Sequence, residues 1–260
     1  MKYIYKGTDG RKELKEFLAK AEKEKYNRPI SKPIEKSIQE TTQLTLSKDL
    51  EFITDENLYK EISKYLKTEF SNLDNKLEFK GKIMKQSNSY LTVAIDMYLK
   101  KNIPDYRLAI QADLETDLSK FKNFYVDSGL ALRNLTGANK EKAEHIFKQL
   151  KQRGIKVEEF PIWLNLRGLE LDKNLNFNLT DESVYSPQSS LNWKSGTKYS
   201  KINELGLPKE VDENSNRQIW TNNYALSRCY LGRSSDLFAN SSNFSNSNDN
   251  GRMTYLLARK

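Results

Sequence analysis

The sequence offers one conceivable Cys–His pair for nucleophilic catalysis, made of its single cysteine, Cys229, and its single histidine, His145. A thiol becomes a good nucleophile when an adjacent base or cation lowers its pKa, so the two residues would have to meet in the fold. His145 falls within a predicted helix, and the sequence indicates no partner for it there. We therefore interpret His145 as a structural residue and predict no catalytic residue and no enzymatic activity.

The sequence also contains no complete motif for binding a metal or a phosphate. One cysteine and one histidine are too few for a zinc site and exclude an intrachain disulfide. The stretch NSNDNG (246–251) resembles the start of a calcium loop, but Leu257 stands where the EF-hand needs a bidentate glutamate. Glu158 and Glu159 are adjacent, so on a strand they would point to opposite faces. No phosphate loop, HExxH or GxSxG motif occurs, and we predict no metal and no cofactor.

The composition is that of a polar globular protein. The chain has 260 residues, 37% of them hydrophobic, and a net charge of +8 from 43 basic and 35 acidic residues. This mixed charge predicts a solvated surface rather than a basic nucleic-acid-binding face. The absence of a long apolar run predicts no membrane span, and the charged start lacks a secretory segment. We expect synthesis in the cytoplasm without a signal peptide, which leaves action on a virion or cell surface open.

Residues 1–115 are expected to form a helix-rich N-terminal region of unknown role. Apolar residues at helical spacing predict amphipathic helices over 9–26 and 57–70. The intervening stretch 41–54 is typical of short strands or an extended arm. Residues 90–99 are apolar enough for a buried strand or a short helix, and their length does not decide between the two.

Residues 116–260 predict strands with long irregular connections around one helix. Residues 124–135 are expected to be extended and buried. The best helix lies at 138–153, with Thr136 or Asn139 as its cap and Gly154 as its left-handed end. Pro161 indicates that the next strand lies at an edge or a bulge. Further strands are expected at 155–171, 176–182, 218–220 and 252–258, whereas 186–218 is turn-rich.

The segment LSRCYLGRSSDLFANSSNFSNSNDNGRM (226–253) is the most unusual part of the chain. Every residue from 240 to 250 except Phe244 is Asn, Ser or Asp. Such a run is normally typical of a flexible tail, yet here a patterned segment precedes it and a predicted strand follows it. Apolar or glycine positions alternate with residues that look freely exchangeable. In this respect the segment resembles the variable proteins of diversity-generating retroelements.

In that family a reverse transcriptase copies a template repeat with errors at adenines, and the variable region lies near the end of a C-type-lectin fold. The resemblance implies a variable region near 224–250 and an exposed, diversified ligand-binding surface. That surface would comprise Tyr230, Gly232, Arg233, Ser234, Ser235, Asp236, Phe238, Asn240, Ser241, Ser242 and Asn243. The implied scaffold is Leu226, Leu231, Leu237, Ala239, Phe244, Gly251 and Met253, with Trp163, Trp193 and Trp220 in the core. The calcium and sugar ligands of true lectins are not matched.

Together these features predict an α+β protein with a C-terminal C-type-lectin-like domain at 116–260. We expect a non-enzymatic binding protein that recognises a protein or cell-surface macromolecule, with Tyr230, Arg233 and Phe238 as its main anchors. One alternative is a basic nucleic-acid-binding protein, whose binding would depend on salt and not on residues 230–243. Another is an interaction protein in which 240–250 is an ordinary flexible loop. The ligand and the oligomeric state stay open.

Overall fold

The computed structural model describes residues 50–73, 76–155 and 161–257. All of them belong to one compact unit, Leu46–Lys260. The helix expected at 9–26 and most of the extended segment expected at 41–54 lie outside the described residues.

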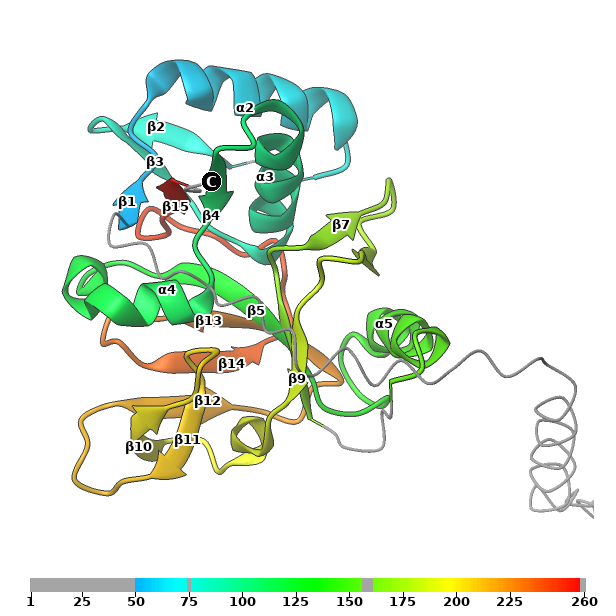
Figure 1. The fold of residues 1–260 in the computed structure, drawn as a ribbon, viewed down its shortest axis with the longest axis vertical. Helices are drawn as coiled ribbons and strands as arrows, with labels where there is room; N and C mark the ends of the chain where they lie inside the picture. The colour runs from blue at the N-terminus through cyan, green and yellow to red at the C-terminus, as the bar shows by residue number, and fades with distance from the viewer. Residues whose placement is uncertain (1–49, 74–75, 156–160, 258–260) are drawn as a thin grey trace, which may run out of the picture. The chain divides into compact units, whose positions relative to one another are not determined.

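The described residues form a mixed α and β structure, in agreement with the expected α+β class (Figure 1). The helices are α2 (Glu56–Glu69), α3 (Ser89–Asn102), α4 (Gln111–Leu114) and α5 (Lys140–Gln152), with 3-10 helices η2 (Glu115–Phe121) and η3 (Ser189–Asn192). The strands are β1 (Leu50–Phe52), β2 (Glu78–Lys80), β3 (Ile83–Lys85), β4 (Tyr106–Leu108), β5 (Val126–Leu132), β6 (Ile162–Asn165), β7 (Leu169–Leu171), β8 (Phe177–Leu179), β9 (Tyr185–Pro187), β10 (Thr197–Ile202), β11 (Pro208–Val211), β12 (Gln218–Thr221), β13 (Leu226–Leu231), β14 (Leu237–Ser241) and β15 (Thr254–Leu257).

The main sheet has eight strands in the order β11-β10-β12-β14-β13-β5-β6-β9. Strands β12 and β14 are parallel, and the other neighbours are antiparallel. In Figure 1 the strands β13, β14, β12 and β10 follow one another down the view, while α2 and α3 lie at the opposite end beside β1, β15 and β4.

Strand β15 sits between β1 and β4 in a small antiparallel sheet. The chain end therefore pairs with segments from well before residue 116. The boundary expected between residues 115 and 116 consequently falls inside one packed unit.

Helices α2 and α3 begin where a side chain accepts free backbone N–H groups. The Asp55 carboxylate accepts from Asn57 N at 2.7 Å, and Asn88 Oδ1 accepts from Leu91 N at 2.8 Å. The helix expected at 57–70 is confirmed. The open choice for 90–99 resolves as helix α3, which is buried on most sides.

Helix α5 confirms the helix expected at 138–153, and Gly154 has the expected positive φ of 76°. The N-terminus of α5 differs from the expectation that Thr136 or Asn139 caps it. Asn139 has a φ of 64° and its side chain caps no helix N–H. Its amide instead donates to Leu226 O at 2.9 Å and to Ser242 O at 2.8 Å, because these carbonyls at the start of β13 and just after β14 need donors. Asn139 thus ties the polar segment to the sheet.

The expectation that Pro161 marks an edge or a bulge is wrong. Strand β6 lies between β5 and β9, and Pro161 stands immediately before its first residue. At that position the missing N–H costs no ladder hydrogen bond, while its carbonyl accepts from Gln188 N at 2.9 Å. The turn-rich stretch 186–218 also contains more strand than expected, since β9, β10 and β11 are too short to show periodicity.

The centre of the core is β5, in which all residues are buried. Gly129 of β5 packs directly against the buried indole of Trp163 on β6. The expected core position holds for Trp163, which is 1% exposed, but Trp193 and Trp220 are only partly buried. Successive residues of a strand point to opposite faces of the sheet. Ile219 points to the packed face of β12, so Trp220 points to the other face and is less buried. No helix in the described part of the chain is long and apolar enough to cross a membrane.

Gly129→Ala is expected to lower the free energy of unfolding by about 2 kcal/mol or more, because overpacking a tight core strains its neighbours. A Cβ at residue 129 would lie 2.2 Å from Trp163 Nε1 and 2.9 Å from Leu164 O. Urea unfolding measures the change. Gly81→Ala is the control, since a Cβ there meets nothing within 4 Å and only the positive φ opposes it. Equal stability of Gly129→Ala and the parent would contradict this packing.

Candidate binding face

The residues with the strongest predicted role lie on a hairpin made by β13 and β14. Its turn is closed by hydrogen bonds from Gly232 N to Asp236 O at 2.8 Å and from Ser235 N to Gly232 O at 3.0 Å. Ser235 has a φ of 63°, the left-handed conformation that completes such a turn. The turn fixes the register, and the register decides which side chains share a face.

That register places three aromatic side chains in one row across the sheet. Tyr230 pairs with Phe238 on β14, and Phe238 pairs with Trp220 on β12. The Tyr230 and Phe238 rings stack at 4.9 Å with an interplanar angle of 6°, and the Phe238 and Trp220 rings lie at 6.1 Å and 15°. All three are partly exposed. We call Trp220, Phe238 and Tyr230 the aromatic row.

The opposite face of the same strands is fully packed. Leu231 pairs with Leu237, and Leu237 pairs with Ile219, so these residues alternate with the aromatic row. All three are 0% exposed. The aromatic row therefore lies on a sheet whose other side is anchored in the core.

Two residues next to the row support it rather than extend it. A Cβ at Gly232 would lie 2.3 Å from the Phe238 ring, so the bare glycine makes room for that ring. Asp236 is 7% exposed and accepts hydrogen bonds from Gln218 N at 2.8 Å, Trp220 Nε1 at 3.1 Å and Ser234 Oγ at 2.8 Å. Its carboxylate orients the Trp220 indole.

Tyr230, at one end of the aromatic row, lies next to a buried ion pair between Arg228 of β13 and Asp127 of β5. Arg228 Nε lies 2.8 Å from Asp127 Oδ1, and a terminal guanidinium nitrogen lies 2.7 Å from Oδ2. The two residues are 3% and 1% exposed. The guanidinium also lies over the rings of Tyr230 at 4.8 Å and Tyr125 at 5.6 Å.

Further groups form hydrogen bonds with the two charged side chains of this pair. Ser87 Oγ donates to Asp127 Oδ2 at 2.9 Å, and Arg228 donates to Asn246 O at 2.6 Å. Burial by itself lowers the pKa of Arg228, but the attraction of Asp127 outweighs it, so the pKa is raised and the guanidinium stays charged. The pair therefore joins β13, β5, the segment before α3 and the polar run.

The polar run at 240–250 is tied to the fold along its length. Asn88 Nδ2 donates to Ser245 O at 3.2 Å, and Asn248 N donates to the Tyr125 hydroxyl at 3.0 Å. Phe244 is 3% exposed and lies against the rings of Tyr90 and Phe177 at 5.8 and 5.5 Å. These contacts are those of an ordered segment and speak against a loose loop.

The predicted variable residues divide by exposure. Arg233, Ser234 and Asn243 are exposed, and a larger group is partly exposed: Tyr230, Ser235, Phe238, Asn240, Ser241 and Ser242. Gly232 and Asp236 are buried, so the expectation that they lie on the surface is wrong, for the packing and hydrogen-bonding reasons above. The predicted scaffold residues are buried, apart from the partly exposed Trp220: Leu226, Leu231, Leu237, Ala239, Phe244, Gly251 and Met253.

The cysteine and the histidine serve structure at their positions. Cys229 is 0% exposed, and burial raises the pKa of its thiol to about 12, so the thiolate is scarcely formed at neutral pH. His145 Nε2 lies 2.9 Å from Asn178 Oδ1 on β8. The buried Cys229 thiol is therefore not prepared for nucleophilic chemistry.

Sequence reasoning did not find Trp220, Tyr125 or the Arg228–Asp127 pair as parts of this face. The residues come from three strands separated by up to about a hundred positions, and only strand pairing brings them together. Comparisons of the chain with protein-family models, curated proteins and solved structures give no match.

Asp127→Asn is expected to lower the free energy of unfolding by about 3–5 kcal/mol, because it leaves a buried charged guanidinium without its counter-ion. Urea unfolding at neutral pH measures the loss. Glu210→Gln is the matched control, since it breaks the exposed Lys201–Glu210 pair at 2.7 Å and is expected to change stability little. Similar effects of the two substitutions would contradict a special role for the buried pair.

Proposed function

We propose that this protein is a non-enzymatic binding protein that recognises a macromolecular partner through the aromatic row and the polar side chains around it. The observation that carries the proposal is that three stacked aromatic rings stay partly exposed beside an exposed Arg233. Aromatic and arginine side chains supply most of the binding energy in known interfaces.

The surroundings of the row suit that role. Ser234, Asn240 and Ser241 lie partly or fully exposed on the same hairpin and provide adaptable hydrogen-bonding groups. Tyrosine, serine and asparagine are used in this way in antibody loops, where rigid rings give area at a small entropic cost. The binding face is thereby rich in contacts that do not depend on one particular ligand.

A rigid support is the second requirement. The hairpin is held from behind by fully buried residues such as Leu231 and Leu237 and from the side by the Arg228–Asp127 pair. Because the support is already ordered, changes in the exposed residues do not add an ordering cost to binding. Such an arrangement supports the proposal that the exposed residues vary among copies of this protein.

We further propose that the chain is a variable protein of a diversity-generating retroelement and that its second half is a C-type-lectin-like domain. The support is the sequence resemblance of 226–253 together with a predominantly antiparallel sheet to which this segment contributes β13 and β14. Its partner would be a protein or another macromolecule on a cell surface, met by a protein carried on a virion or a cell.

The test is a pair of libraries displayed on yeast. One randomises seven positions with an exposed or partly exposed side chain: Tyr230, Arg233, Ser234, Phe238, Asn240, Ser241 and Asn243. The other randomises seven buried positions: Leu226, Leu231, Gly232, Asp236, Leu237, Ala239 and Phe244. Both are screened for protease resistance and then selected on streptavidin as a defined protein target.

We expect the surface library to stay protease-resistant and to yield streptavidin binders that carry aromatic residues at 230 or 238. The buried library is expected to lose its folded members, because core volume and the Asp236 hydrogen bonds cannot be replaced at random. A surface library that unfolds as readily as the buried one, or that yields no binders, would overturn the proposed function.

A further inference from the structure

Two of the three rings of the aromatic row are covered by other side chains. Phe238 is stacked between Tyr230 at 4.9 Å and Trp220 at 6.1 Å. On the side of β5, the Arg228 guanidinium lies over the Tyr230 ring at 4.8 Å. The Trp220 ring turns one face to Phe238 on β14, so its other face points towards β10, the next strand of the sheet. This outer indole face is the free end of the row.

The strand position beside the outer indole face holds a glycine. Thr197 of β10 pairs with Ile219 of β12, and the same register places Gly196 opposite Trp220. Gly196 has a φ of 87°, which glycine adopts readily, and a Cβ there would lie 4.0 Å from Trp220 Cζ3. Strand β11 pairs with residues 199–202 of β10 and does not extend past this position. The indole face therefore stands beside bare backbone rather than a side chain.

A primary amide lies next to the same space. The position that a Cβ of Gly196 would take is 3.6 Å from Gln218 Oε1. Gln218 is partly exposed, and its side-chain amide forms no hydrogen bond within the part of the chain that the structure describes. A carboxamide offers two N–H donors and a carbonyl acceptor. The Gln218 amide can thus bond with two neighbouring hydroxyl groups of one ligand.

The indole and its surroundings favour a neutral ligand. Trp220 Nε1 donates to the Asp236 carboxylate at 3.1 Å, which polarises the ring and makes its faces more negative. Such a face attracts polarised C–H groups. Lys198, on the same side of β10, donates to Glu213 O at 3.0 Å and is engaged there. A cationic ligand is disfavoured by the positive charges of Lys198 and of the exposed Lys194.

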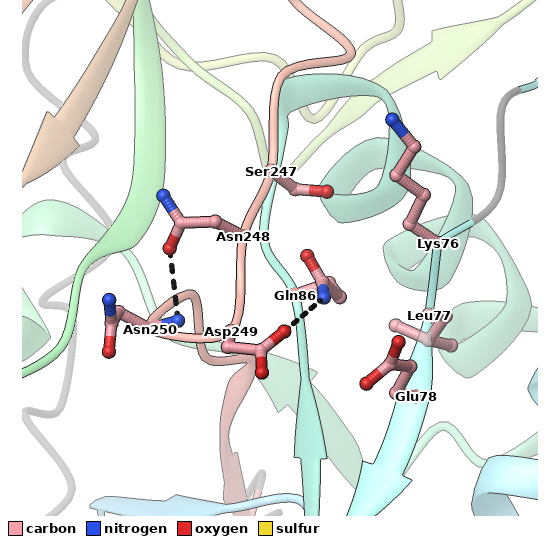
Figure 2. Close-up of a pocket in the computed structure, with 8 residues that line it drawn as sticks. All are labelled: Lys76, Leu77, Glu78, Gln86, Ser247, Asn248, Asp249 and Asn250. Carbon is pink, nitrogen blue, oxygen red and sulfur yellow. Dashed lines mark hydrogen bonds between the residues drawn. The ribbon is translucent and has the colours of Figure 1, made fainter.

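A polar depression elsewhere in the molecule does not offer this combination. Its volume is about 530 Å³, and it is lined by residues 76–78, Gln86 and residues 247–250, none of which is aromatic (Figure 2). The Gln86 amide there already donates to Asp249 Oδ1 at 3.2 Å. The open ring face beside an unbonded amide is therefore a feature of β12 and not of this depression.

We propose that Trp220, Gly196 and Gln218 form a binding site for a hexopyranose unit of a glycan. The C–H groups on one face of the sugar ring lie on the indole, two hydroxyl groups at its rim bond with the Gln218 amide, and Gly196 leaves room for the ring. These residues lie outside 226–253, so copies that differ in the variable region share the site. The inference rests on the proposed function and names the chemistry of the partner at the constant part of the same face.

The test is an NMR titration of the full-length, ¹⁵N-labelled chain, followed at the indole N–H signal of Trp220. That signal is identified as the one missing from Trp220→Phe. We expect methyl β-D-glucopyranoside, methyl β-D-galactopyranoside or both to shift it, whereas sorbitol, which has hydroxyl groups but no ring, leaves it in place. Saturation transfer from the protein is expected to be strongest at the C–H protons of one face of the sugar, because only that face lies on the indole.

Gln218→Leu is expected to weaken pyranoside binding by about tenfold, because the hydrogen bonds of the amide are lost. Gln152→Leu is the matched control, since Gln152 is exposed at the end of α5, outside the sheet. Trp220→Phe is expected to weaken binding as well, because a phenyl ring offers less area for stacking than an indole.

The proposal is overturned if neither pyranoside shifts the signal, if sorbitol shifts it equally, or if the two leucine variants have the same effect. A response to adenosine monophosphate or Nα-acetyl-arginine methylamide, but to neither pyranoside, would also overturn it and assign the indole face to a nucleobase or a guanidinium group. The surface library leaves positions 196, 218 and 220 unchanged. Streptavidin binders from that library without a pyranoside response would therefore overturn this inference alone, and a pyranoside response without streptavidin binders would count against the proposed function alone.

Discussion

The buried pair between Arg228 and Asp127 is the interaction on which the rest of the binding region depends. Taking both charges out of water is costly, and their attraction offsets this only when geometry is good and the remaining groups are bonded. Here the contact between the two side chains is bidentate. Ser87 Oγ donates a further hydrogen bond to the Asp127 carboxylate, and Asn246 O accepts a further guanidinium N–H of Arg228. Each of these partners comes from a different segment, so the pair can be satisfied in one arrangement of the chain.

A second buried guanidinium has a related role on the other side of the sheet. Arg133 is 5% exposed and donates to Leu191 O at 2.9 Å, to Ser227 Oγ at 2.6 Å and to Ala239 O at 2.6 Å. It thereby connects β5, β13 and β14 with helix η3. Burial lowers the pKa of Arg133, whose hydrogen-bond acceptors here are neutral groups. The two arginines together fix the strands from which the aromatic row rises.

The polar run at 240–250 has a composition typical of disorder, but in the structure it is an ordered segment packed on this region. Its backbone contacts Tyr125, Asn88 and Asn139, and Phe244 anchors its centre in the core. Asparagine and serine are suited to such a segment because their side chains bond to nearby backbone groups in turns. Asn243 Oδ1, for example, accepts from Ser245 N at 3.0 Å. The run thus begins in β14, the strand that carries Phe238 of the aromatic row.

The sequence predicts those parts of the structure that have a strong local signal. The helices at 56–69 and 140–152 follow from periodicity, and the buried strand at 126–132 follows from its apolar composition. The burial of Leu231, Leu237 and Ala239 agrees with the scaffold that the resemblance implies. The location of the candidate face is also predicted, through the exchangeable residues between fixed apolar positions.

The parts that could not be predicted depend on distant pairing. The helical state of 89–102 is set by burial on most sides, and Asn139 faces carbonyls from distant strands instead of capping its own helix. The register between β12, β14 and β13 places Trp220 in the aromatic row and Gly232 and Asp236 at buried positions. Local sequence carries no information on these contacts.

The most direct measurement is deep sequencing of the 3′ part of the gene in its source population. On a diversified binding face, substitutions accumulate at the codons of the exposed residues between 230 and 243 and derive from a near-copy of this region. Leu237, Ala239, Gly251 and the pair Asp127–Arg228 should stay unchanged. An invariant segment, or substitutions spread equally over exposed and buried positions, would contradict a diversified binding face on a fixed scaffold.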